Sequence, residues 1–181
     1  MSMTRSRGYT LVELIVAMGL FALVMLLASG AYLMMIGANR QAQAISTGID
    51  NLSFALESMT RSIRTGTSYD CGTLTASPND CSGGKSTFSF KDQSGKIIAY
   101  TVNASTLQES TDGGNTWVSL TDPSVNISSL MFYAYDTEPT SDGNYGQPRV
   151  TIVVSGSVSS GPNKTVPFTV ETGATMRGVD L

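Results

Sequence analysis

The sequence Arg-Gly-Tyr-Thr-Leu-Val-Glu at residues 7–13 leads into a run without charge at residues 14–39. This run is long enough to cross a bilayer as a helix, which needs about 20 apolar residues. One carboxylate, Glu13, stands at its start. An ionised carboxylate at the centre of a membrane helix costs about 2.5–3.5 kcal/mol, and such groups usually mark function. We therefore expect Glu13 to have a cationic partner, and the nearest candidate is the amine that a cut after Gly8 would create at Tyr9.

This N-terminal pattern resembles the class III signal of type IV prepilins and type II secretion pseudopilins. The resemblance rests on residues 5–8, residues 9–13 and the apolar run behind them. It implies that prepilin peptidase cuts after Gly8 and N-methylates Tyr9, and that Glu13 acts in subunit assembly. The family most often has Phe at the position of Tyr9. Many major pilins also have a helix-breaking proline where this chain has Gly30, which favours a minor subunit.

The length of 181 residues allows one domain and a long helix. Removal of residues 1–8 takes away Arg5 and Arg7, so that 9 basic residues face 14 acidic ones, a net charge of −5. The charge is scattered and includes no basic stripe of the kind that nucleic-acid binding requires. We therefore predict no direct nucleic-acid binding.

The sequence contains no histidine, which removes many chemistries. Neither a Ser-His-Asp nor a Cys-His nucleophile can be assembled without an imidazole base. Zinc sites with histidine ligands are also excluded, and two cysteines cannot form a four-thiolate site. We expect a protein without catalytic residues and without an obligatory cofactor, although an enzyme that uses only carboxylates stays open.

Three regions follow one another along the chain and predict an α+β fold, and the resemblance implies that this fold is pilin-like. Residues 1–8 are the expected leader peptide. Residues 9–66 are expected to form one long helix, with 9–39 as the transmembrane or filament-core part and 40–66 as an amphipathic part that packs on an antiparallel β-sheet domain at 67–181. The second part of the helix has apolar residues at spacings of 3 and 4, which form one helical face. They are Ile45, Ile49, Leu52, Leu56, Met59 and Ile63, and Gly66 is the expected stop.

Short β-branched runs separated by turn residues predict consecutive antiparallel strands in the C-terminal part. In the run at residues 149–157, Val150, Ile152 and Val154 alternate with more polar neighbours, which places one face of this strand in the core. The expected strands are residues 87–90, 97–103, 106–109, 117–120, 129–135, 149–157 and 165–171.

Cys71 and Cys81 flank a nine-residue loop. If this part of the chain is exported, as the resemblance implies, its compartment is oxidising and a disulfide is expected. Closing a loop of this size stabilises the fold by roughly 3 kcal/mol in the chain-entropy model. We interpret the pair as a structural staple, because the spacing is not that of a redox Cys-x-x-Cys motif.

Residues 110–117 read Ser-Thr-Asp-Gly-Gly-Asn-Thr-Trp and resemble the Asp-box of sialidases and other β proteins. In those families the box is a structural hairpin turn away from the active site. Asp112 is suited to bond backbone amides, the glycines allow positive φ, and Trp117 can cover the base of the hairpin. The sequence therefore predicts a hairpin here and gives no support to glycosidase chemistry.

Asp136, Glu138 and Asp142 are calcium candidates, because clustered oxygen ligands in a loop suit this ion. Some pseudopilins have a calcium-stabilised loop, so the resemblance allows the same here. The spacing is not that of an EF-hand, and we favour a solvated acidic loop.

The leading interpretation is a minor pilin or pseudopilin, most similar to the J-type minor pseudopilins, which prime the filament tip. The resemblance implies prepilin peptidase, other pilin or pseudopilin subunits and the inner-membrane assembly platform as partners. Arg5 and Arg7 favour a single pass through the cytoplasmic (inner) membrane, N-in and C-out, before entry into an extracytoplasmic filament.

The alternative is a secreted or membrane-anchored β-rich binding protein with an ordinary signal peptide cut near Ala28-Ser29-Gly30-Ala31. The apolar run is longer than the 7–15 residues usual for such a signal, which argues against it.

Overall fold

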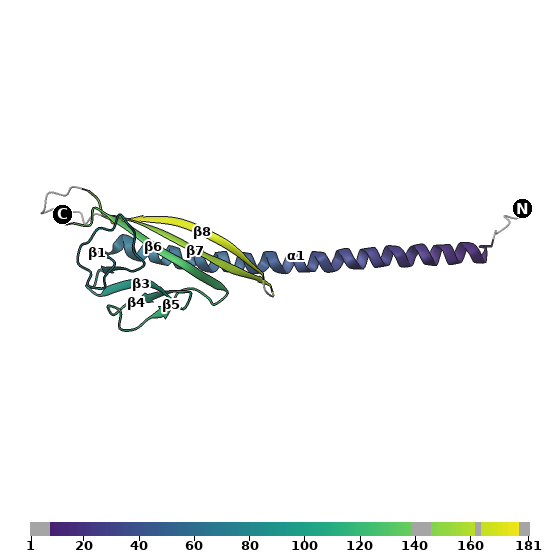
Figure 1. Ribbon diagram of the computed structural model, residues 1–181, viewed down its shortest axis with the longest axis horizontal. Helices are drawn as coiled ribbons and strands as arrows, with labels where there is room; N and C mark the ends of the chain where they lie inside the picture. Colours follow the sequence, from purple (N-terminus) through teal and green to yellow (C-terminus); the bar gives the residue numbers. More distant parts are fainter. Residues whose placement is uncertain (1–7, 139–145, 162–163, 178–181) are drawn as a thin grey trace, which may run out of the picture. The chain divides into compact units, whose positions relative to one another are not determined.

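The computed structural model describes residues 8–138, 146–161 and 164–177. The chain divides into two compact units, Met1–Gln41 and Ala42–Leu181. One helix, α1 (Leu11–Thr65), extends from the first unit into the second, and the strands all belong to the second (Figure 1). The structure thus has the predicted α+β architecture, a long N-terminal helix and antiparallel β-sheets.

The helix α1 begins with a capping interaction that the sequence analysis overlooked. The backbone N–H of Glu13 donates to Thr10 Oγ1 at 3.3 Å, which caps the first turn. Thr10 and Glu13 have the Thr-x-x-Glu spacing of a capping box. The helix was predicted at residues 9–66, and it begins two residues later, at Leu11. The capping interaction of Thr10 fixes this start.

In the first unit, every residue from 8 to 35 is exposed. The apolar stretch of α1 meets the length and composition of a membrane span, and none of it is buried within the protein. Ser29 is satisfied within the helix, because its hydroxyl donates to the Met25 carbonyl oxygen at 2.8 Å. A helix that is apolar on all sides needs surroundings of lipid or of other apolar helices.

In the second unit, α1 buries one face, as the spacing predicts. The prediction was wrong at the start of this face, since Ile49 is 47% exposed and Gly48 is buried instead. A Cβ at Gly48 would come within 2.4 Å of Val158 Cγ1, so glycine lets the helix approach strand β7 (Arg149–Gly161). The buried residues of α1 are Gly48, Leu52, Ala55, Leu56, Met59 and Ile63.

Gly66 ends the helix by close packing. A Cβ at Gly66 would lie 2.1 Å from a ring carbon of Phe90. Its N–H donates to the Ile63 carbonyl oxygen at 3.0 Å, which tightens the last turn. The hydroxyl of Tyr69 donates to the same carbonyl oxygen at 2.5 Å. Burial raises the pKa of Tyr69, so this hydroxyl keeps its proton and remains a donor.

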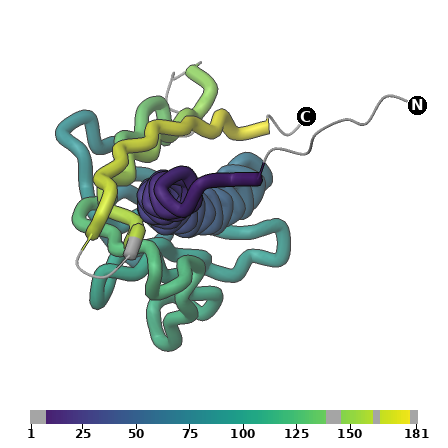
Figure 2. Tube along the Cα trace, turned by 90° about the vertical axis from the view of Figure 1, so that its right-hand side faces the viewer, coloured from purple at the N-terminus to yellow at the C-terminus, as the bar shows by residue number. Residues whose placement is uncertain are grey.

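The strands form two antiparallel sheets, which lie around the second part of α1 (Figure 2). The five-stranded sheet has the order β1-β2-β3-β4-β5 and the three-stranded sheet the order β6-β7-β8. The bounds are β1 (Thr67–Cys71), β2 (Phe88–Lys91), β3 (Ile97–Asn103), β4 (Thr106–Ser110), β5 (Val118–Ser119), β6 (Val125–Tyr135), β7 (Arg149–Gly161) and β8 (Lys164–Thr175).

The inner faces of both sheets and the buried face of α1 share one hydrophobic core. Val150, Ile152 and Val154 of β7 are buried, which confirms the predicted alternation. Phe88 of one sheet stacks on Phe132 of the other with ring centroids 5.2 Å apart, so aromatic contacts join the two sheets. The largest buried side chains of the core are Tyr69, Tyr100, Phe88, Phe90, Phe132, Met59 and Ile63.

Candidate functional site

The predicted processing junction lies just before α1 and is open to other molecules. Gly8 is exposed and Tyr9 is 85% exposed. A Cβ added at Gly8 would meet no described atom within 4 Å, and Gly8 does not have a positive φ. Nothing in the described part of this chain therefore requires glycine at position 8, and any requirement must come from a molecule that binds here.

Glu13 lies in the first turn of α1 and is exposed. Its carboxylate has no cationic partner within residues 8–138, 146–161 and 164–177. An acid in the first turn interacts favourably with the helix dipole by about 0.3–1 kcal/mol. Glu13 thus favours the start of the helix within the chain, while its charge remains available to a partner molecule.

A long apolar helix that carries a β domain, with an accessible glycine junction before it, defines a membrane-anchored protein of pilin-like architecture. Residues 3–29 match the family model of the prokaryotic N-terminal methylation motif. This match covers the N-terminal part of the chain, and it supports a type IV prepilin-like protein of the kind that prepilin peptidase processes. No curated protein and no solved structure matches the chain.

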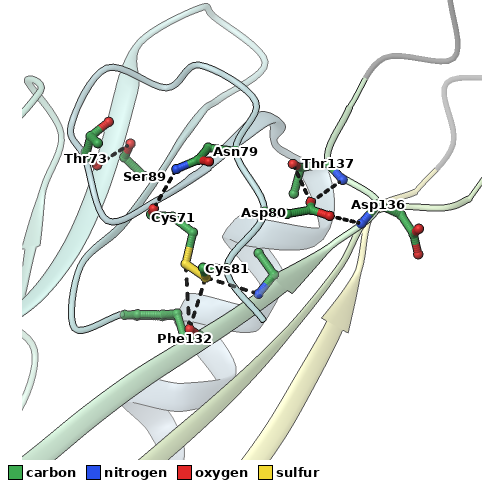
Figure 3. The surroundings of a disulfide bond; sticks show 10 residues. Cys71, Thr73, Asn79, Asp80, Cys81, Ser89, Phe132, Asp136 and Thr137 are labelled. Carbon is green, nitrogen blue, oxygen red and sulfur yellow. Dashed lines mark hydrogen bonds between the residues drawn. A yellow bond between two sulfur atoms is a disulfide. The ribbon is translucent and has the colours of Figure 1, made fainter. Parts of the chain in front are cut away.

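Cys71 and Cys81 form a disulfide with a Cα–Cα distance of 5.8 Å (Figure 3). The two residues are 1% and 6% exposed, so an external thiol cannot reach the sulfur atoms without local opening. The loop is also tied to β6, since Cys81 N–H donates to the Ala134 carbonyl oxygen at 3.0 Å. This burial is that of a structural staple rather than of a redox site.

The segment from residue 80 to 85 also contacts β6 (Val125–Tyr135) and the residues that follow it. Asp80 accepts hydrogen bonds from the Thr137 backbone N–H at 2.9 Å and the Thr137 hydroxyl at 2.7 Å (Figure 3). Lys85 and Phe132 exchange backbone hydrogen bonds of 2.9 and 2.7 Å. The segment from residue 80 to 85 therefore connects the two sheets.

The buried carboxylate of Asp70, which was not predicted as a functional residue, accepts hydrogen bonds from the loop between Cys71 and Cys81. Asp70 is 1% exposed. Its Oδ2 accepts hydrogen bonds from the Thr75 hydroxyl at 2.7 Å and the Thr75 N–H at 3.2 Å, and also from the hydroxyl of Thr73. The signal in the sequence was an acid followed by threonines at the third and fifth positions, a pattern in which local hydroxyls can satisfy a carboxylate.

The Asp-box forms the predicted hairpin turn, and β4 and β5 pair on either side of it. Asp112 Oδ1 accepts from the backbone N–H groups of Thr116 at 2.8 Å and Asn115 at 3.0 Å. The Thr116 hydroxyl and N–H are the main causes that lower the pKa of Asp112 to about 2. Trp117 is half-buried and its Nε1–H donates to the Gly114 carbonyl oxygen at 3.1 Å. These contacts are those of a structural turn.

The calcium candidates do not come together in the described part of the chain. Asp136 forms a 3.6 Å ion pair with Arg149, whose guanidinium also lies 5.2 Å from the ring centroid of Tyr135. Glu138 is exposed, and Asp142 lies outside the described residues. Among the described residues there is no group of three side chains of the metal-binding types. The cationic partner of Asp136 is therefore Arg149 of the same chain.

Proposed function

We propose that the chain is a non-enzymatic minor pilin or pseudopilin. Prepilin peptidase cuts after Gly8 and methylates the new N-terminus at Tyr9, and the mature subunit enters a type IV pilus or a type II secretion pseudopilus. The observation that carries this proposal is the methylation motif at residues 3–29, on an exposed junction before an unburied apolar helix. The open space around Gly8 supports recognition of this glycine by the peptidase.

Glu13 is the assembly residue in this proposal. In an apolar filament core its carboxylate pairs with the terminal amine of Tyr9 in an adjacent subunit. The absence of a cationic partner within the described part of the chain supports an intermolecular pairing. Removal of one partner would leave the other charge stranded in an apolar core, which is strongly unfavourable.

The proposed topology is N-in and C-out, with Arg5 and Arg7 on the cytoplasmic side. The buried Cys71–Cys81 disulfide supports it, because disulfides persist in oxidising compartments outside the cytoplasm. The inner-membrane assembly platform then receives the processed subunit. Gly30, in place of the proline of many major pilins, and the Trp-bearing β domain support a minor, J-type role that primes the filament tip.

The experiment is mass spectrometry and N-terminal sequencing of the mature protein from membranes of cells that contain prepilin peptidase. We expect the chain to start at N-methylated Tyr9. A start near Gly30 or Ala31 would instead identify an ordinary signal peptide and end the proposal.

A variant pair makes this experiment specific for the junction. Gly8→Ala should block the cut, because the peptidase must read the residue before it. Gly19→Ala is the matched control, since a Cβ there also meets no described atom within 4 Å, and this variant should be cut normally. Equal processing of both variants would contradict the assignment of Gly8.

A further inference from the structure

An open pocket of about 310 Å³ lies at the end of α1 in the second unit. Three of the five arginines that follow Gly8 line it, together with one acid and two hydroxyl side chains. We call it the arginine pocket, and its lining residues are Glu57, Thr60, Arg61, Arg64, Thr65 and Arg177.

Backbone hydrogen bonds bring the two sides of the arginine pocket together. Arg177 follows β8, and its N–H donates to the carbonyl oxygen of Arg64 at 2.9 Å. Both backbone polar groups of the preceding residue, Met176, are hydrogen-bonded. Its N–H donates to the Pro148 carbonyl oxygen at 2.9 Å, and its carbonyl oxygen accepts from Gln147 Nε2 at 2.6 Å. The end of β8 therefore lies against the end of α1 (Figure 1), and Arg177 is fixed at the backbone before any ligand binds.

The charge in the arginine pocket is largely uncompensated. Glu57 and Arg61 are 3.8 Å apart, and their side chains are 74% and 82% exposed, so this contact is weak. Arg64 and Arg177 have no acidic partner within residues 8–138, 146–161 and 164–177. Three guanidinium groups against one carboxylate leave a local excess of positive charge on a chain with a net charge of −3.

Helix stabilisation explains only part of this arrangement. Arg64 lies in the last turn of α1, where a cation interacts favourably with the helix dipole. Arg177 is not part of the helix, and it comes to the same place through the hydrogen bond to the Arg64 carbonyl oxygen. A second arginine beside one that already faces the helix end suggests an anionic ligand.

The lining residues also indicate the kind of anion. They include no aromatic and no aliphatic side chain, so the pocket offers no stacking surface for a base and no apolar wall for an acyl chain. A single carboxylate has one charge and two oxygens, which one arginine can satisfy. A phosphate monoester has about −1.5 to −2 charges at pH 7 and three acceptor oxygens, which suits several guanidinium forks.

We propose that the arginine pocket binds a phosphate monoester through Arg61, Arg64 and Arg177. The proposal does not depend on processing or filament assembly, since it concerns residues of the second unit only. The source of the phosphate group is either a small soluble molecule or a lipid headgroup, and both present the same chemistry to the pocket.

The test is a titration of the full chain in neutral detergent with inorganic phosphate, at constant ionic strength, followed by calorimetry. We expect saturable binding that tightens as the pH rises and inorganic phosphate gains its second negative charge. Arg64→Gln and Arg177→Gln should each weaken binding about tenfold or more, as expected for the loss of a charged hydrogen bond. Arg40→Gln is the matched control, because it removes an exposed arginine of α1 outside the pocket and should leave binding unchanged.

The same titration is repeated with Asp180→Asn, because this acid is near Arg177 in the sequence and lies outside the described residues. Competition by phosphoserine identifies a soluble source, and competition by vesicles that contain phosphatidic acid identifies a lipid source. Absence of saturable binding in both the wild type and Asp180→Asn would overturn the proposal. Acetate that binds as tightly as phosphate, or an equal loss of binding in Arg40→Gln, would also overturn it.

Discussion

The two parts of α1 are one continuous helix, yet they differ in what surrounds them. In the first part, residues 11–39, every residue except Ile36 is exposed, although residues 14–35 are almost entirely apolar. The second part buries only one face, and Met59 and Ile63 on that face are 0% exposed. The comparison shows that the pattern of apolar residues, and not their number, decides whether a helix packs on its own chain.

The contrast extends to the glycines. A Cβ at Gly19, Gly30 or Gly37 in the first part meets no described atom within 4 Å, whereas a Cβ at Gly48 would clash with Val158. Glycine in the second part therefore has a structural reason within the chain. In the first part the reason, if there is one, lies in a neighbouring molecule, and small residues at membrane helix interfaces allow such close approach.

The largest effect on stability is expected from the core of the second part. Met59→Ala should lower the free energy of unfolding of the β domain by about 2–5 kcal/mol, because it removes a completely buried side chain and leaves a cavity. Leu26→Ala, at a position 75% exposed in the first part, should leave that free energy unchanged. Denaturant unfolding followed by the fluorescence of Trp117, the one tryptophan of the sequence, measures both. Equal losses in the two variants would mean that the first part also supports the domain.

The next effect concerns the disulfide. Replacement of both Cys71 and Cys81 by serine should destabilise the β domain by roughly 3 kcal/mol, because the unfolded chain gains the entropy of the open loop. The helical circular dichroism of the first part should stay unchanged. Ser82→Ala, exposed in the same segment, is the control and should have an effect within about 0.5 kcal/mol. A loss of the same size in Ser82→Ala would point to the segment itself rather than to the cross-link.

A smaller effect, of opposite sign in the two parts, is expected from one substitution at two glycines. Gly48→Ala should destabilise the domain by about 1–3 kcal/mol, since its Cβ would lie 2.4 Å from a branched side chain that has few alternative rotamers. Gly37→Ala should increase helicity and stabilise α1 by up to about 1 kcal/mol, since space is open there. Thermal unfolding by circular dichroism compares the two, and a destabilised Gly37→Ala variant would refute the open-space argument.

Local patterns predicted much of the fold. The spacing of the apolar residues predicted most of the buried face of α1, and the strand expected at residues 97–103 is β3 (Ile97–Asn103). β1 (Thr67–Cys71) was missed, because three of its five residues are polar and only Gly66 separates the strand from the helix. The start of β6 at Val125 was missed as well, because a register shift between Ile127 and Ser129 interrupts the alternation on which the prediction relied.

The arginine pocket could not be predicted for a different reason. Arg64 and Arg177 are far apart in the sequence, and their proximity depends on how the last strand returns to the end of the helix. Neither local spacing nor composition reports such a contact. The motif at residues 3–29, by contrast, is contiguous, so the sequence alone was sufficient to reveal the resemblance to type IV prepilins.

The smallest effect on stability, and a large one on assembly, is expected at Glu13. Its two roles, the favourable helix start and the proposed pairing with the amine of Tyr9, are separable, because glutamine also suits the third position of a capping box. Glu13→Gln should therefore keep the helix start and the β domain unchanged within about 0.5 kcal/mol. If the charge is what matters, Glu13→Gln should be cut after Gly8 like the wild type and yet be lost from sheared filaments as completely as Glu13→Ala, measured as the fraction of mature subunit in the filament. If Glu13→Gln enters filaments normally and Glu13→Ala does not, the first part of α1 depends on this residue for its helical start, and the pairing with Tyr9 is wrong.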